Sequence, residues 1–172
     1  MSFDRIHFED GKIYHDYHWN GMQENIDKEI KEQDKINFYN SKLLISDFKY
    51  SFIDPLIDKS KLDGTWIENL TYDKFKLKLK TNNGETSCYF QTNEINLPKP
   101  TTKVVSYLKG DIPSNANVEY TIIHDNGTVK VEDGKPIDLN KETTTLKLKV
   151  DIYNIPTDQA PPEIYDYCLM WS

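Results

Sequence analysis

From about residue 43 to the C-terminus, apolar and polar positions alternate with a period of two, the pattern of β-strands that bury one face. The segment Phe75–Lys80 alternates strictly between apolar residues and lysine, and the turn residues Asn82-Asn83-Gly84 separate it from Thr86–Gln91. This arrangement predicts a hairpin with one buried face and a lysine-rich face in water. Thr143–Tyr153 shows the same alternation. Its expected inward positions are Leu146, Leu148, Val150 and Ile152.

Further strands are expected where β-branched and aromatic residues gather between turn signals such as Asn126-Gly127. Their ranges are Leu43–Phe52, Val104–Leu108, Val118–His124 and Thr128–Glu132. The segment after Pro161-Pro162 is apolar on nearly both faces, which predicts a central strand with a neighbour on each side. One face carries Ile164, Asp166, Cys168 and Met170, and the other Tyr165, Tyr167, Leu169 and Trp171. The spacing of the turns predicts a mainly β fold, an antiparallel β-sandwich or jelly roll, over residues 41–172.

The first 40 residues follow a different pattern and are expected to attach the protein to others. An aromatic, polar stretch broken at Asp10-Gly11 predicts a short hairpin or extended arm. Beyond it, Asn20 is a suitable N-cap for a helix over residues 21–39. The narrow apolar stripe of this helix needs cover, either from the β domain or from copies of itself in an oligomer such as a trimer. The candidate assembly residues are Tyr14, Tyr17, Trp19, Met22, Ile26 and Ile30.

Composition narrows the classes of partner. The chain has 172 residues, room for one domain and a short appendage, and a formal net charge of −7 with Arg5 as its sole arginine. A nucleic acid or an anionic membrane is therefore a poor partner, because binding either one requires a basic surface and none is expected on this chain. No apolar run is long enough to span a bilayer, so synthesis in a cytoplasm is expected. There, Cys88 and Cys168 are expected to remain free thiols.

No pattern along the chain indicates catalysis, so we expect a protein that is not an enzyme and has no cofactor or metal. His15 and His18 lack a third ligand at a diagnostic spacing for zinc, and the Asp125-Asn126-Gly127 turn lacks the rest of a calcium loop. No nucleophile lies in a glycine-rich turn. Paired carboxylates on facing strands keep a glycoside hydrolase as a third alternative, since 28 acidic residues produce such pairs by chance.

Aromatic residues carry the second alternative, a carbohydrate-binding or receptor-binding module. Rings that share one exposed face of a sheet would stack on sugars, whereas buried rings would serve the core or a subunit contact. The candidate stacking residues are Trp66, Tyr107, Tyr120 and Tyr165, with Tyr72 and Tyr89 as further members of the set.

The C-terminal half resembles the sandwich modules of bacteriophage tail, fibre and baseplate proteins. The resemblance covers roughly residues 63–172 and rests on order: Asp125-Asn126-Gly127, then Pro136-Ile137-Asp138-Leu139, then Thr145–Val150, and finally Pro161–Tyr167. Pro161-Pro162 replaces the usual Ser-Pro of those modules, and the Trp that often follows the turn is missing after Asp125-Asn126-Gly127. The resemblance implies a structural virion protein that contacts other tail or baseplate proteins. Abundant Lys, Asn and Ile indicate AT-rich codons and hence a low-GC genome, and together with the resemblance this implies a phage of low-GC Gram-positive bacteria.

Overall fold

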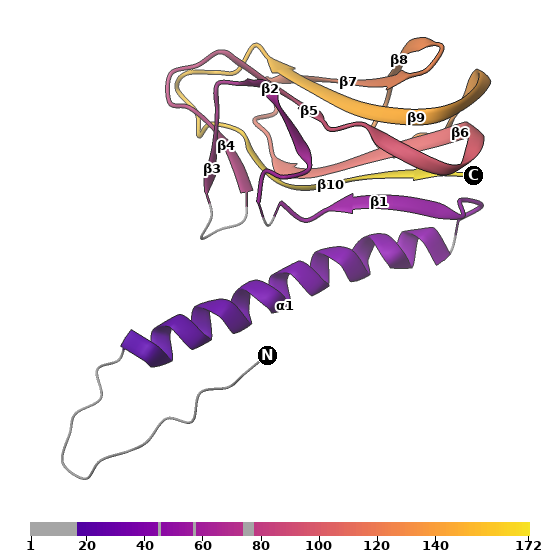
Figure 1. Cartoon of the computed structure of the whole chain (residues 1–172). Coiled ribbons are helices and arrows are strands. Elements are labelled where there is room, and N and C mark those ends of the chain that lie inside the picture. The colour runs from indigo at the N-terminus through magenta and orange to yellow at the C-terminus, as the bar shows by residue number, and fades with distance from the viewer. Residues whose placement is uncertain (1–16, 45, 57, 74–77) are drawn as a thin grey trace, which may run out of the picture.

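Strands that bury one or both faces make up most of the chain, as the alternation predicts. The computed structural model describes residues 17–44, 46–56, 58–73 and 78–172, with side chains from residue 25 onward (Figure 1). It is mainly β and antiparallel, sandwich-like and nearly closed, with one helix among the described residues. The elements are α1 (Tyr17–Leu44), β1 (Tyr50–Asp54), β2 (Leu62–Glu68), β3 (Leu70–Asp73), β4 (Lys78–Thr81), β5 (Ser87–Thr92), β6 (Ile95–Asp111), β7 (Asn117–His124), β8 (Gly127–Val131), β9 (Ile137–Tyr153) and β10 (Glu163–Trp171).

Two long strands, β6 and β9, run through both layers of the sandwich. Each has 17 residues, and they pair at Ile95 with Leu146 in one layer and at Val104 with Ile137 in the other. The register shifts between these points, which bends the strands from layer to layer. The first layer holds β2, β5, β7, β8 and the C-terminal half of β9, and the second holds β1, β3, β4, β10 and the C-terminal half of β6 (Figure 1).

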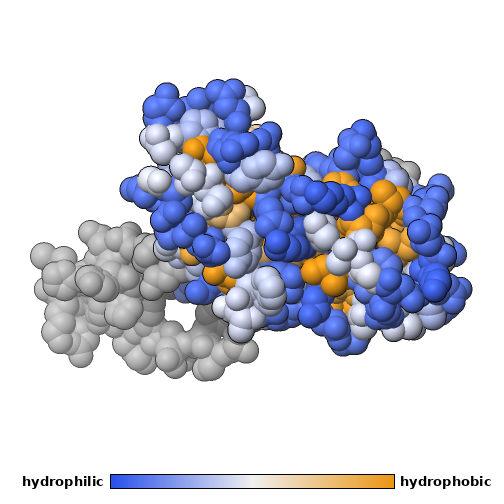
Figure 2. Space-filling model, turned by 90° about the horizontal axis from the view of Figure 1, so that it is seen from above, coloured by the Kyte–Doolittle hydropathy of each residue, from blue (hydrophilic) through white to orange (hydrophobic). Residues whose placement is uncertain are grey.

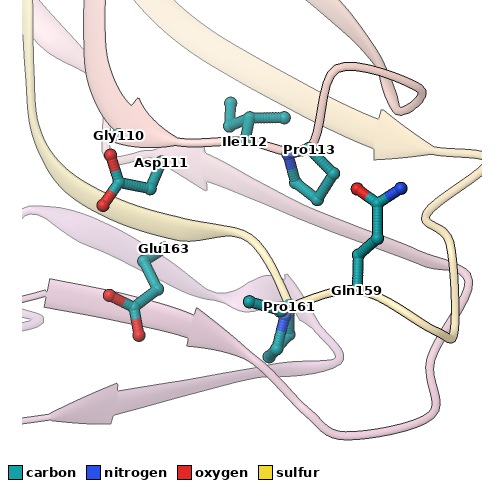
Figure 3. Close-up of a pocket in the computed structure, with 8 residues that line it drawn as sticks. Gly110, Asp111, Ile112, Pro113, Gln159, Pro161 and Glu163 are labelled. Atoms are coloured by element: carbon teal, nitrogen blue, oxygen red, sulfur yellow. The ribbon is translucent and has the colours of Figure 1, made fainter.

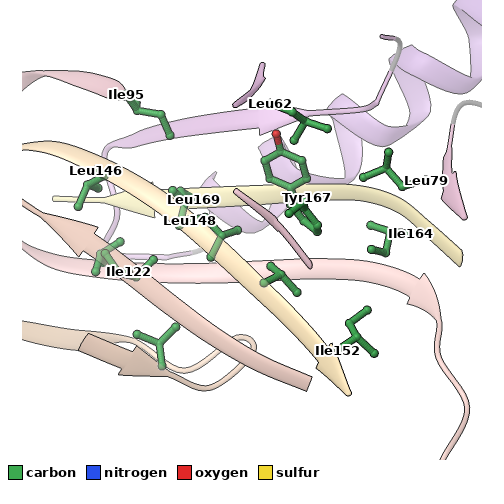
Figure 4. Packing of buried hydrophobic residues seen from close by; sticks show 14 of the residues in the cluster. Leu62, Leu79, Ile95, Ile122, Leu146, Leu148, Ile152, Ile164, Tyr167 and Leu169 are labelled. Carbon is green, nitrogen blue, oxygen red and sulfur yellow. The ribbon is translucent and has the colours of Figure 1, made fainter. Parts of the chain in front are cut away.

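The main core lies between the two layers, where apolar side chains of both point toward one another (Figure 4). The four inward positions predicted on β9 are all buried, which confirms the phase of that alternation. Cys88 faces the main core and Cys168 the opposite side of the second layer, and both are buried free thiols.

Strand β10 is the central strand that its two apolar faces predict. It pairs with β1 on one side and with β6 on the other, and every side chain from Asp166 to Trp171 is buried. Tyr167, Leu169 and Trp171 face the main core. The predicted facing of Ile164 is wrong, because a register shift between Ile164 and Asp166 turns Ile164 into the main core with Tyr167. Alternation in the sequence does not reveal such a bulge.

The predicted hairpin between Phe75–Lys80 and Thr86–Gln91 is wrong. Strand β4 pairs with β3 and β10, whereas β5 pairs with β2 and β9 in the other layer. The turn at Asn82–Gly84 therefore connects the layers. Lys78 is also buried, bound to Glu163, instead of facing water. Residues 75–77 lie outside the described residues.

Several element boundaries differ from their predictions. The helix begins at Tyr17, so Asn20 lies inside it and is no N-cap, and it ends at Leu44 inside the predicted strand Leu43–Phe52. Strand β1 begins only at Tyr50, and the short strands β2 and β3 have no counterpart in the prediction. In the part of the chain that the structure describes, no helix has both the length and the apolar composition needed to span a bilayer.

Burial predicts how two leucines differ in their effect on stability. Replacing Leu169, fully buried on β10, with Ala should lower the free energy of unfolding by about 2–5 kcal/mol, because the lost contacts leave a cavity. Leu44→Ala is the matched control, since Leu44 is 86% exposed and should change stability by no more than about 0.5 kcal/mol. Urea unfolding measures both, and equal effects would contradict the burial of β10.

Candidate interaction surfaces

The C-terminal third of α1 packs on the outer side of the second layer and forms a second, smaller core there. Tyr39 is 1% exposed and packs with Phe48, Val105, Cys168 and Met170. Leu43, Ile53 and Tyr107 lie around this cluster, and the Lys42 ammonium stands 4.7 Å above the ring of Tyr107. Strand β10 is therefore covered on both faces, by the main core and by the helix.

Polar groups fix the orientation of the helix on the sheet. The Tyr39 hydroxyl donates a hydrogen bond to the buried carboxylate of Asp166 on β10. One turn earlier, the Lys35 ammonium donates to the backbone oxygens of Tyr165, at 2.6 Å, and Pro55, at 2.8 Å. We call Lys35, Tyr39 and Asp166 the helix latch. Because these bonds are directional, they set the rotation of α1 about its axis as well as its position.

Two carboxylates near the latch are held in an apolar setting. Burial raises the pKa of Asp166 above its ordinary value, against the lowering effect of the Tyr39 hydrogen bond. Burial also raises the pKa of Asp54, whose carboxylate accepts a hydrogen bond of 2.5 Å from the Tyr167 hydroxyl. The Lys35 ammonium has a lowered pKa for the same reason, because burial disfavours its charge.

The opposite side of α1 is exposed and partly apolar. Ile30 lies nine residues before Tyr39, which is two and a half helical turns, so the two side chains point in opposite directions. Ile26 is 47% exposed and Ile30 54% exposed, so neither is covered by the β domain. We define the outer face of α1 as the exposed residues Ile26, Ile30, Gln33, Asn37, Asn40 and Leu44.

The structure describes only some of the predicted assembly residues. Tyr14 lies outside the described residues. The backbone of Tyr17, Trp19 and Met22 belongs to α1, but their side chains are outside the described part. Ile26 and Ile30 are neighbours on the outer face, as their spacing of four predicts. The predicted arm and the pair His15 and His18 also lie outside the described part.

The four predicted stacking residues occupy separate places. Trp66 lies on β2, with its ring centroid 6.5 Å from that of Tyr89. Tyr107 borders the helix cluster, and Tyr120 packs against the main core. Tyr165 donates its hydroxyl hydrogen to Asp111. Among the described residues, no ring contact joins two of these four.

A pocket of about 520 Å³ lies where β6 ends and β10 begins (Figure 3). Gly110 is required there, because a Cβ would collide with the backbone oxygen of Glu163. Asp111 and Glu163 place their carboxyl groups on the same side of the view, away from Gln159. The Tyr165 hydroxyl lies 3.3 Å from Glu163 and also binds Asp111.

In this pocket, Glu163 is unsuited to the general-acid role of a glycoside hydrolase. Lys78 binds Glu163 and lowers its pKa, which keeps that carboxyl ionised. The general acid of a glycosidase needs a raised pKa instead. The contacts of Lys78, Glu163, Tyr165 and Asp111 act as a brace between β4, β6 and β10.

Over the described ranges, no three His, Cys, Asp or Glu side chains come close enough to hold a metal ion together. Seen from above relative to the view of Figure 1, the surface of the molecule is mostly hydrophilic, with hydrophobic residues in separate spots (Figure 2).

No protein-family model matches the chain, and no curated protein is detectably similar to it. The inference of function therefore rests on the surfaces described above.

The buried carboxylate of the latch predicts a pH effect. The pKa of Asp166 is raised in the folded state, so the folded protein binds more protons than the unfolded chain at pH values from its ordinary pKa of 3.8 up to the raised value. Its contribution to stability is greatest below 3.8 and falls as the pH rises through this window. Asn does not titrate, so Asp166→Asn should abolish this pH dependence. The free energy of unfolding of the variant relative to that of wild type should therefore increase as the pH rises through the window.

Urea unfolding of both proteins at a series of pH values measures the difference. Parallel profiles would contradict a raised pKa at Asp166. Taking the difference between the two proteins is necessary because other carboxylates, such as Asp125, have lowered pKa values and contribute with the opposite sign.

Proposed function

We propose that this chain is a non-enzymatic assembly protein that attaches to a neighbouring protein through the outer face of α1. The observation that carries the proposal is the exposure of Ile30 on the side of the helix opposite the buried Tyr39. The helix latch ties Tyr39 to β10, so the helix cannot turn Ile30 toward its own domain without breaking buried hydrogen bonds. Because the β domain does not cover this face, we infer that another chain does.

The outer face has the spacing of a coiled-coil seam. Positions 26, 30, 33, 37, 40 and 44 are separated by four and three residues in turn, which is the heptad pattern. Ile26 and Ile30 are about half exposed, so burying the rest of each against a partner would contribute roughly 0.8–1.5 kcal/mol before the costs of association. Gln33 and Asn37, joined by a side-chain hydrogen bond of 3.0 Å, add polar positions that favour one register.

Charge at the flanks favours a different protein over a second copy. Glu29 and Asp34 are exposed beside the seam, at the positions that face each other in a parallel pair of identical helices. In an antiparallel pair, like flanks meet and acids again oppose acids. A partner groove or helix with apolar seam residues and lysine or arginine at its flanks would match this face. We therefore favour attachment to such a protein over the self-associating trimer.

The kind of assembly that we propose, a phage tail or baseplate, rests on the resemblance to phage tail and baseplate modules. A virion appendage fits a chain in which one helix binds a neighbour while the β-sandwich is presented outward. The ion pair that holds Glu163 to Lys78 gives this carboxyl a structural contact between β4 and β10 and excludes it as a general acid, which supports a structural role.

A pair of synthetic helical peptides tests the chemistry of the partner. Both carry Ile and Leu along one heptad seam, and they differ only at the flanking positions, which are Lys in one peptide and Glu in the other. The Lys peptide should bind the full chain and weaken with added salt, whereas the Glu peptide should not bind. Ile30→Asp should weaken binding of the Lys peptide by about tenfold or more. Isothermal titration calorimetry measures these affinities.

Two further results distinguish the proposal from its rivals. Tyr153→Ala, an exposed aromatic on the opposite layer, is the matched control and should bind the Lys peptide like wild type. Sedimentation should find the full chain monomeric at micromolar concentration. A stable trimer that Ile26→Asp and Ile30→Asp dissociate would replace the partner protein by a second copy, and equal binding of both peptides would contradict the charge argument.

A further inference from the structure

The outward face of the first layer carries aromatic rings among hydrogen-bonding groups. Strand pairing places Glu68, Tyr89, Asp151 and Glu119 in one row across β2, β5, β9 and β7. These side chains point away from the main core, because their neighbours Ile67, Cys88, Phe90 and Ile152 point into it. The row thus crosses four strands of an open sheet face, far from the helix.

Three aromatic residues follow this row. Trp66 is 47% exposed beside Tyr89, with the two ring planes inclined at 53°. Tyr153 is 41% exposed and lies two residues beyond Asp151, the cross-strand partner of Tyr89. This diagonal relation places the Cα atoms of Tyr89 and Tyr153 about 7–8 Å apart, with both side chains on the same face. Single exposed aromatics are ordinary, whereas here two exposed rings and the half-buried ring of Tyr89 share one sheet face, which we call the aromatic platform.

Charged groups beside the rings are paired with each other. Lys149 binds Asp151 at 2.8 Å and stands 5.2 Å above the ring of Tyr89. On the adjoining strands, Lys130 binds Glu119 at 2.7 Å. Tyr89 also forms a hydrogen bond with Glu68, which raises the pKa of its hydroxyl. The platform therefore offers carboxylate acceptors and ammonium donors beside ring faces.

We propose that this platform, Trp66, Tyr89 and Tyr153 with their charged neighbours, binds an uncharged oligosaccharide. A pyranose ring has an apolar C–H face that packs on an aromatic ring and a rim of hydroxyls that bind carboxylates and ammonium groups. The face is open and crosses several strands, so it fits an extended chain of sugars better than a small molecule, which requires a concave site.

Charge selects the class of sugar. The platform has three carboxylates, Glu68, Glu119 and Asp151, against the two ammonium groups of Lys130 and Lys149, and the whole chain has a net charge of −7. An anionic polysaccharide would be repelled by this surface. The binding site is independent of the attachment proposed for α1, because it lies on the other layer of the sandwich (Figure 1).

Nuclear magnetic resonance titration of the full chain with defined sugars tests this site. The neutral probes are hexasaccharides of β-linked glucose, α-linked glucose and N-acetylglucosamine, and the anionic probe is an oligogalacturonate. At least one neutral probe should shift the indole N–H signal of Trp66 and the amides of β5 and β9, and the anionic probe should not. Trp66→Ala and Tyr153→Ala should each weaken binding by roughly tenfold, as the loss of an aromatic contact does.

Phe38→Ala is the matched control, because Phe38 is an aromatic residue of similar exposure, 44%, on the helix side. It should leave sugar binding unchanged. Trp66 and Tyr153 are both exposed, so Trp66→Ala and Tyr153→Ala should keep the wild-type spectrum outside the platform. The proposal is overturned if no neutral probe shifts the platform signals at millimolar concentration, if Trp66→Ala binds sugar as wild type does, or if a proline-rich peptide binds this face and the sugars do not.

Discussion

The need to bury both faces of β10 determines the arrangement of the whole molecule. Its inner face completes the core of the sandwich through Tyr167, Leu169 and Trp171, and its outer face carries Cys168 and Met170, which no strand covers. Helix α1 supplies that cover through Tyr39, and the carboxylate of Asp166 on the same outer face gives the Tyr39 hydroxyl a partner. A strand with apolar side chains on both faces thus requires a third layer, and the helix is that layer.

The outward direction of Ile30 follows from the same contact. A helix anchored by Tyr39 and Lys35 has one rotational setting, and in that setting the Ile26 and Ile30 stripe lies away from the protein's own domain. The aromatic platform of Trp66 and Tyr89 lies on the other layer of the sandwich. If both proposals hold, the protein binds a neighbouring protein with one side and a sugar with the other, an arrangement suited to a part that is fixed in an assembly and faces outward.

Particular residues show how far the sequence leads. Leu146 to Ile152 alternate and are buried in that phase, since a period of two directly reflects which face of a strand is inside. Lys78 follows the same rhythm yet is buried, because Glu163 and Tyr165 from β10 cover it. The outer stripe of α1 was visible as Ile26 and Ile30, whereas Lys35 and Tyr39, which hold the helix, look like ordinary polar and aromatic positions. Tyr153 was missed because nothing near it in sequence marks it; its place beside Tyr89 comes from strand pairing.

By itself, the sequence determined the class of fold, the inward phase of β9, the central place of β10 and the presence of one helix before the strands. These are local properties, in which periodicity and burial on one face or two are written into consecutive residues. Only the tertiary structure decided that β4 and β5 belong to different layers, that a bulge turns Ile164 inward and that Asp166 meets Tyr39. The physical reason is that pairing and docking join residues far apart in the chain, and a hydrophobic pattern specifies that a face must be buried without specifying against what.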